Sequence, residues 1–129
     1  MDASKGRKKV ILTIDDDADI RAALRVVLQA EGFTVGEAAS GEEGLKVAQS
    51  IQPDAIVVDL MMEKVDTGQQ VIEDLRGSGY TKPIYLLSSA GDTVRYNIDG
   101  PALGLSGIFQ KPINPKMLVD TLKAKLFQD

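Results

Sequence analysis

The sequence predicts a single α/β domain, built as an open, doubly wound sheet of five parallel strands with helices on both faces. Extended and helical patterns alternate from one end of the chain to the other, which is the order of successive β-α-β units. Crossovers in such units are right-handed, so they place helices on both faces of the sheet. The 129 residues suit one domain, and a chain of this size buries roughly 68% of its unfolded surface.

The first strand and helix are predicted by a change of pattern around three acids. Residues 10–14 are mostly β-branched or aliphatic and indicate a strand buried on both faces. The acids at 15–17 follow this strand directly, and Asp17 is expected to serve the start of the next helix. Helical spacing then forms one apolar face, made of Ile20, Ala23, Leu24, Val27 and Leu28. Gly32 ends this helix.

The next strand and helix lead to a second apolar strand. Residues 33–38 indicate an extended segment. Ser40 and Glu43 have the spacing of a capping box, in which the serine caps the first turn of a helix, and Pro53 closes that helix. Residues 55–58 then indicate a strand without polar interruption.

A loop, a helix and a fourth strand follow. We expect a loop over 61–68 and then a helix that residues 77–79 terminate. The inward-facing residues of this helix are Val71, Ile72 and Leu75. Residues 83–87 indicate the fourth strand, which two serines end.

The last third of the chain predicts a short strand between two helices. Residues 92–103 carry a helical spacing that a Gly-Pro pair must break. Residues 107–110 indicate a fifth strand, and Asn114 with Pro115 begins a last helix. The inner face of that helix carries Leu118, Leu122 and Leu126. The whole pattern therefore contains five strands and five helices.

The composition narrows the available chemistry. The chain has no cysteine and no histidine, so disulfides, thiolate metal sites and imidazole bases are excluded. A net charge of −4 argues against nucleic-acid binding, and no apolar stretch approaches the roughly 20 residues that span a bilayer. We expect a cytoplasmic protein without a direct nucleic-acid or membrane partner. A basic run within residues 1–8 predicts a flexible tail before a domain at 9–127.

Polar side chains follow several predicted strands at the point where each strand ends. Two acids end the first strand, and single residues end the third, fourth and fifth: Asp15, Asp16, Asp59, Ser89 and Lys111. Ligands of doubly wound sheets bind outside the carboxyl ends of the strands, so we expect these side chains to converge at one edge. Each alone has an ordinary explanation as a helix cap, a turn hydroxyl or a surface lysine. Their shared placement indicates a site.

The residue types of this edge suggest its chemistry. Three carboxylates without cysteine or histidine predict a hard-oxygen site suited to Mg²⁺, and the spacing lacks a calcium loop. A carboxylate beside such a cation can attack a phosphoryl group and form an aspartyl phosphate. A lysine and a hydroxyl would complete the charge neutralisation. Gly36, Gly41 and Gly44 lack the spacing of a nucleotide-binding loop, so we do not expect an ATPase.

Four segments occur in a fixed order: Ile14 to Asp17, Pro53 to Asp59, Leu87 to Ala90, and Lys111 to Ile113. Through them the chain resembles the receiver domain of response regulators in two-component signalling, over about residues 9–127. The resemblance implies a flavodoxin-like sheet with the strand order 2-1-3-4-5. It also implies that a sensor histidine kinase or a histidine phosphotransfer protein phosphorylates Asp59, which switches the binding of an effector protein.

The resemblance assigns roles to the other site residues. The implied Mg²⁺ ligands are Asp15, Asp16, Asp59 and the backbone carbonyl of Met61. Ser89 would move to bond the phosphoryl group, and Lys111 would pair with it. The peptide bond between Lys111 and Pro112 is expected to be cis, a form that X-Pro bonds allow.

The resemblance also implies what the domain does with the phosphoryl group. It would not be an enzyme, beyond its own phosphoryl transfer and slow self-dephosphorylation. The surface that binds the effector would comprise residues 92–103, the fifth strand and the last helix. Within it, Tyr96, Ile98 and Leu103 could form a patch that binds a partner, although we expect them to lie in the core.

Two positions depart from the family pattern and leave alternatives open. The segment after Asp59 lacks the usual Met-Pro pair and is one residue longer, as in a degenerate receiver that binds its partner without phosphorylation. Ile108 replaces an aromatic residue that often swings inward on activation, so we expect no such rotation. A phosphatase with an aspartyl nucleophile would need an acid in place of Met61, and a flavin-binding module would need a phosphate loop after the first strand.

Overall fold

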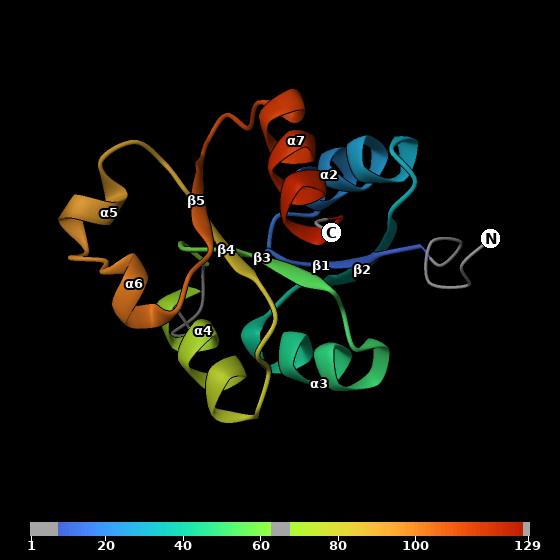
Figure 1. The fold of residues 1–129 in the computed structure, drawn as a ribbon. Helices are drawn as coiled ribbons and strands as arrows, with labels where there is room; N and C mark the ends of the chain where they lie inside the picture. Colours follow the sequence, from blue (N-terminus) through green and yellow to red (C-terminus); the bar gives the residue numbers. More distant parts are fainter. Residues whose placement is uncertain (1–7, 63–67, 128–129) are drawn as a thin grey trace.

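A computed structural model describes residues 8–62 and 68–127 of the chain (Figure 1). Five parallel strands form one sheet in the order β2-β1-β3-β4-β5, which confirms the predicted topology. The strands are β1 (Val10–Ile14), β2 (Thr34–Ala38), β3 (Ala55–Asp59), β4 (Ile84–Ser88) and β5 (Gly107–Gln110). This order places β1 beside β3, so the ends of the two acid-bearing strands are neighbours.

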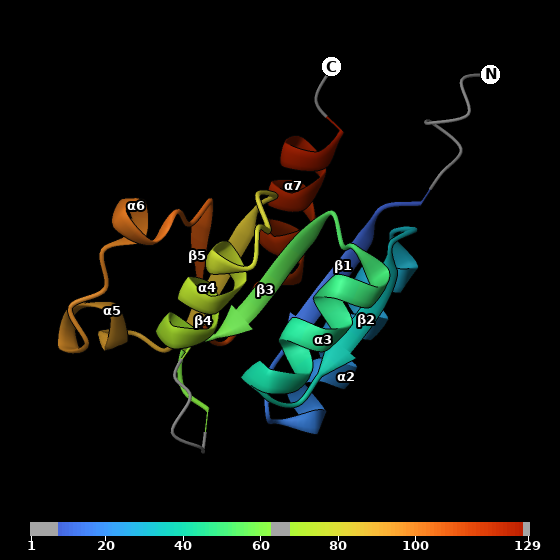
Figure 2. The same cartoon turned by 90° about the horizontal axis from the view of Figure 1, so that it is seen from below.

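Helices cover both faces of the sheet (Figures 1 and 2). One face carries α2 (Ala18–Ala30) and α7 (Pro115–Leu126), and the other carries α3 (Gly41–Ile51) and α4 (Gly68–Gly77). Two short helices, α5 (Asp92–Arg95) and α6 (Gly100–Leu103), connect β4 to β5, with α6 packed beside α4. The winding therefore reverses between β1 and β3, at the edge where the acids lie.

The core consists of two layers, one on each face of the sheet. The layer under α3 and α4 includes Leu12, Ile14, Ile56, Val58, Ile84 and Leu86. The layer under α2 and α7 includes Ile11, Ala55, Val57, Tyr85, Leu87 and Phe109. Successive residues of a strand face opposite sides, so each central strand contributes to both layers. The charged residues of these strands are consequently confined to the strand ends.

The start of the central strands is also polar. The carboxylate of Asp54, directly before β3, accepts a hydrogen bond from the Val10 amide at 2.8 Å and lies 3.4 Å from Lys82 Nζ. Nearby, the hydroxyl of Tyr80 donates to the carbonyl of Pro53 at 3.1 Å. These contacts fix the edge of the sheet opposite the acids.

Side chains cap the starts of α2, α3 and α7. Asp17, Ser40 and Asn114 each accept a hydrogen bond from a backbone amide in the first turn of α2, α3 and α7. These contacts confirm the caps that the sequence predicts. Asp17 is therefore part of a helix start, which leaves the two acids before it for another role.

The segment 92–103 differs from the prediction. It forms two four-residue helices, so the described residues contain six helices where the sequence predicts five. Between the two helices, Asn97 adopts a φ of 53°, a left-handed conformation that cannot continue a helix. Pro101 lies in the first turn of α6, where its missing amide is harmless, and Asp99 caps that turn. The Gly-Pro pair, which the sequence predicts to break a helix, therefore begins α6.

Two predictions fall largely outside the described residues. The basic tail at 1–8 shares only Lys8 with them, so the division into a tail and a domain at 9–127 stays a prediction. The loop at 61–68 has its centre, 63–67, outside them. Within the described ranges, none of the helices has the length and hydropathy required to cross a bilayer.

Candidate functional site

The carboxyl edge of the sheet gathers three acids. Asp15 and Asp16 directly follow β1, and Asp59 is the last residue of β3. One carboxylate oxygen from each residue lies within 4.8 Å of the other two. Like charges at this distance repel one another, so the cluster is costly unless a proton or a cation is shared.

Asp15 is the most deeply buried of the three, with 1% of its surface exposed. Its Oδ1 accepts a hydrogen bond from the Asp17 amide at 2.9 Å, whereas its buried Oδ2 has no hydrogen-bond partner in the described part of the chain. Burial, and to a smaller extent the nearby carboxylates, raises the pKa of Asp15 to about 6. A buried acceptor without a donor is free to bind an ion or another ligand.

Asp59 forms an ion pair with Lys111. The Lys111 Nζ lies 3.0 Å from the Asp59 Oδ1, and the carboxylate is almost fully buried. Burial raises the pKa of Asp59, while the Lys111 ammonium and a backbone hydrogen bond from Met61 oppose this rise. Lys111 follows β5, where its amide donates to the Ser88 carbonyl at 2.8 Å, and its peptide bond to Pro112 is cis. The ion pair brings a positive charge to a buried carboxylate from two strands away.

Ser89 and Met61 follow strands at the same edge, but both are exposed to solvent. The Ser89 amide donates to Asp92 Oδ2 at 3.2 Å, which closes the turn after β4. Among the described residues, no polar contact joins the Ser89 hydroxyl to Asp59 or Lys111. The structure thus brings together the three acids and Lys111. Ser89 lies at the same edge of the sheet, but its hydroxyl makes no polar contact with Asp59 or Lys111 in the described residues.

Helix α4 begins unusually close to the strand that carries Asp59. The amide of Gly68 donates to the Leu60 carbonyl at 2.9 Å. A Cβ atom on Gly68 would clash with the carbonyl oxygen of Asp59 and would lie 2.7 Å from the Leu60 Cα. Only glycine fits this approach, and nothing in the sequence pattern distinguishes this glycine from the others.

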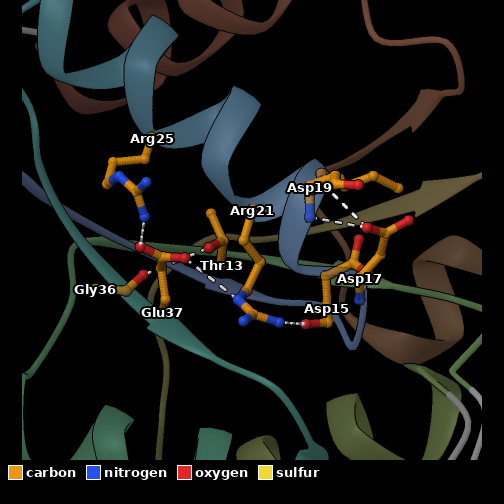
Figure 3. A network of polar contacts seen from close by, with 9 residues as sticks. Thr13, Asp15, Asp17, Asp19, Arg21, Arg25, Gly36 and Glu37 are labelled. Carbon is orange, nitrogen blue, oxygen red and sulfur yellow. Dashed lines mark hydrogen bonds and ion pairs between the residues drawn. The ribbon is translucent and has the colours of Figure 1, made fainter.

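A polar network that the sequence does not predict supports the acids from α2 and β2 (Figure 3). Arg21 Nη1 donates to the carbonyl of Asp15 at 2.5 Å, and Arg21 Nε donates to Glu37 Oε1 at 3.2 Å. Arg25 pairs with the other carboxylate oxygen of Glu37. The two contacts with Glu37 join residues 16 and 12 positions apart in the chain. The sequence signal for them is a charged residue within the extended pattern at 33–38.

The donor set fits a small divalent cation. Carboxylate oxygens are the hard ligands that such cations prefer, and the three acids present one oxygen each to a shared space. The Asp15 Oδ2 supplies an acceptor that no donor in residues 8–62 and 68–127 uses. Asp15, Asp16 and Asp59 could therefore bind a metal ion together.

Comparison with known sequences identifies relatives over nearly the whole chain. The family model for the response regulator receiver domain matches residues 11–123. The response regulator MprA of Mycobacterium tuberculosis is 37% identical over 116 residues, which are 90% of this chain and 50% of MprA. The protein called "Probable transcriptional regulator ycf27" of Cyanophora paradoxa is 39% identical over 119 residues, 92% of this chain and 48% of that protein. This chain spans about half the length of these curated relatives.

Comparison with solved structures agrees. The chemotaxis protein CheY4 of Vibrio cholerae superposes with a TM-score of 0.82 at 33% sequence identity. The superposition covers 93% of this chain and 100% of the CheY4 chain. Both the family model and a full-length structural match thus point to the same fold and motifs. The chain belongs to the response regulator receiver domain family, whose members act in two-component signalling.

Proposed function

We propose that Asp59 accepts a phosphoryl group from a sensor histidine kinase or a histidine phosphotransfer protein. Mg²⁺ would be bound by Asp15, Asp16, Asp59 and the carbonyl of Met61. The observation that carries the proposal is the placement of Asp59, a buried carboxylate 3.0 Å from Lys111 Nζ that shares its edge with two further acids. Membership of the receiver family supports the same role.

The residues of the site divide the chemistry between them. An oxygen of Asp59 forms a bond to phosphorus while the bond between phosphorus and the donor's histidine nitrogen breaks, and that electron pair leaves with the imidazole. Lys111 holds its ammonium beside the nucleophile and pairs with an oxygen of the transferred group. When bound, Mg²⁺ neutralises charge on the phosphoryl oxygens. Ser89 bonds the group after a shift of the exposed turn after β4.

Phosphorylation acts as a switch in this proposal because it adds a charged group at the edge where β3, β4 and β5 end. Moving an equilibrium from 1:99 to 99:1 takes about 5.5 kcal/mol. The phosphoryl group contributes to that change only through contacts that differ between the two conformations. Its contact with Ser89 is one that can differ, since no hydrogen bond joins Ser89 to Asp59 among the described residues.

The surface that responds comprises residues 92–103, β5 and α7. Val94 and Ile108 are exposed there, and Tyr96 is 42% exposed, so the expectation that Tyr96 lies in the core is wrong. Ile98 and Leu103 do pack against the core, as expected. The exposed apolar side chains offer a binding surface to an effector protein. We propose no direct nucleic-acid or membrane partner.

In this role the domain is a signalling module that catalyses at most its own phosphoryl transfer and slow self-dephosphorylation, and it acts in the cytoplasm. The alternative is a degenerate receiver that binds its partner without phosphorylation. The assembled acids and Lys111 do not favour it, because the chemistry of phosphoryl transfer needs those groups together.

Intact-mass measurement after incubation with acetyl phosphate and Mg²⁺ tests the proposal. The wild type and Asp120→Asn should each gain one phosphoryl group, whereas Asp59→Asn should gain none. Asp120 is a matched control because its carboxylate is exposed on α7 and pairs with Lys116. A wild type that gains no mass, or a gain that survives in Asp59→Asn, contradicts the proposal.

A further inference from the structure

Three hydrogen bonds hold the backbone and the side chain of Asp15. Its amide donates to the Ala38 carbonyl at 3.0 Å, and its Oδ1 accepts a hydrogen bond from the Asp17 amide at 2.9 Å. Its carbonyl accepts a hydrogen bond from Arg21 Nη1 at 2.5 Å (Figure 3). That carbonyl belongs to the peptide plane between Asp15 and Asp16. The contact with Arg21 therefore fixes the orientation of both acids that follow β1.

Arg21 is itself anchored. Its side chain is 17% exposed, and its Nε donates to Glu37 Oε1 at 3.2 Å. Glu37 lies in β2 and pairs with Thr13 of β1, two residues before Asp15. The planar guanidinium thus bridges two groups in different directions, a carbonyl at the end of β1 and a carboxylate on the neighbouring strand.

We propose that Arg21 is a positioning residue for the acid pair. By fixing the peptide plane after Asp15, it keeps the oxygens of Asp15 and Asp16 close to Asp59, where a divalent cation would bind. Without this contact the plane can rotate, and the three oxygens are no longer held within 4.8 Å of one another. The inference rests on the proposed function, in which these acids bind Mg²⁺.

A positioning role predicts a specific pattern of effects. Groups that orient metal ligands typically change metal affinity by about 10–100-fold when they are replaced. For Arg21→Met we expect the Kd for Mg²⁺ to rise about tenfold, at the lower end of that range. The rate of phosphorylation at saturating Mg²⁺ should stay close to that of the wild type, because Asp59 and Lys111 are untouched. A purely structural role would lower stability without changing the Mg²⁺ affinity of the folded protein.

The test is an NMR titration of the folded proteins with MgCl₂ alone, following the backbone amides near the acids. Arg25→Met is the matched control, because Arg25 pairs with the same Glu37 from the same helix but does not bind the Asp15 carbonyl. It should bind Mg²⁺ as the wild type does. Arg21→Lys keeps the charge but lacks the fork of donors, so it should lose affinity as Arg21→Met does.

Equal Mg²⁺ affinity in Arg21→Met and the wild type overturns the inference, and so does an equal loss in Arg21→Met and Arg25→Met. If Arg21→Met does not fold, Glu37→Gln decides. This variant weakens the ion pair that anchors Arg21 and should cause a smaller loss of Mg²⁺ affinity. Unchanged Mg²⁺ affinity in Glu37→Gln then overturns the inference. A wild type that binds Mg²⁺ but accepts no phosphoryl group contradicts the proposed function alone. A wild type that binds no Mg²⁺ overturns both.

Discussion

The acid edge, formed by Asp15, Asp16, Asp59 and the strand ends that carry them, is buried, whereas much of the segment 92–103 is exposed. We expect both to take part in signalling. Ile14, Asp15 and Asp59 are each at most 3% exposed, and their backbone is bonded to neighbouring strands. In contrast, Val94 is 84% exposed on a helix of four residues. Chemistry at a buried cluster needs fixed distances, whereas a surface that changes conformation needs few contacts to break. The molecule places these two demands in separate elements.

The largest difference between the two regions should appear when aliphatic side chains are shortened. Ile14→Ala removes a fully buried side chain beside the acids and should lower the free energy of unfolding by about 3 kcal/mol. Val94→Ala, in the exposed segment, should change it by less than about 0.5 kcal/mol. Urea unfolding measures both values. Similar losses in the two variants would show that the segment is as firmly packed as the acid edge.

Replacing a glycine by alanine should also affect the stability of the two regions differently. Gly68→Ala forces a Cβ against the backbone of Asp59 and Leu60 and should destabilise the fold by about 2 kcal/mol. Gly100→Ala is the matched change in α6, where the nearest atom would be 3.9 Å away, and should be close to neutral. Thermal unfolding monitored by circular dichroism compares the variants. A neutral Gly68→Ala would contradict the close approach of α4 to β3.

Arg76 provides the contact that joins the segment to the rest of the fold. Its guanidinium donates to the carbonyls of Tyr80, Lys82 and Gly104 at 2.7 to 2.9 Å, so it ties the end of α4 to the end of α6. Arg76→Met should cost about 1.5 kcal/mol, the lower value for a single hydrogen bond to a charged group, because two of the three bonds are exposed to solvent. Amide exchange should accelerate at Leu105 and stay unchanged at Asp15. Acceleration at both amides would mean that the regions are coupled.

The smallest effect concerns pH in the absence of metal. The pKa of Asp15 in the folded protein, about 6, lies above the ordinary value of 3.8. Stability from this group is therefore greatest below the ordinary pKa and is lost as the pH rises through about 6. Asp15→Asn avoids that loss, so relative to the wild type it should gain about 1 kcal/mol between about pH 5.3 and pH 7.5. Urea unfolding with EDTA measures both proteins, and a difference between Asp15→Asn and the wild type that does not change with pH would contradict the assignment to Asp15.

The sequence predicts the sheet and the acid cluster for the same reason: both depend on where apolar runs end. Residues 10–14 and 55–58 are apolar on both faces, so their order along the chain and the acids that follow them imply neighbouring strand ends. The caps at Asp17 and Ser40 are local signals and are equally readable. Local patterns suffice when the relevant contact lies within a few residues.

The remaining features depend on contacts that no local pattern encodes. The bridge from Arg21 to Glu37 spans 16 residues and exists only after β2 has paired with β1. The division of 92–103 depends on a positive φ at Asn97, which a helical spacing does not reveal. The need for glycine at position 68 appears only once α4 lies against β3.

The carboxylates at the two ends of β1 also bear on how this strand finds its partners during folding. Asp54 receives the amide at the start of β1, and Asp15 sits at the other end. Because β1 is buried on both faces, its apolar residues alone would tolerate a register slipped by one residue. Such a slip would remove the hydrogen bond between the Val10 amide and the Asp54 carboxylate and the one between the Asp15 amide and the Ala38 carbonyl. The hydrogen bonds at the two ends of β1 thereby favour its native register over a slipped one.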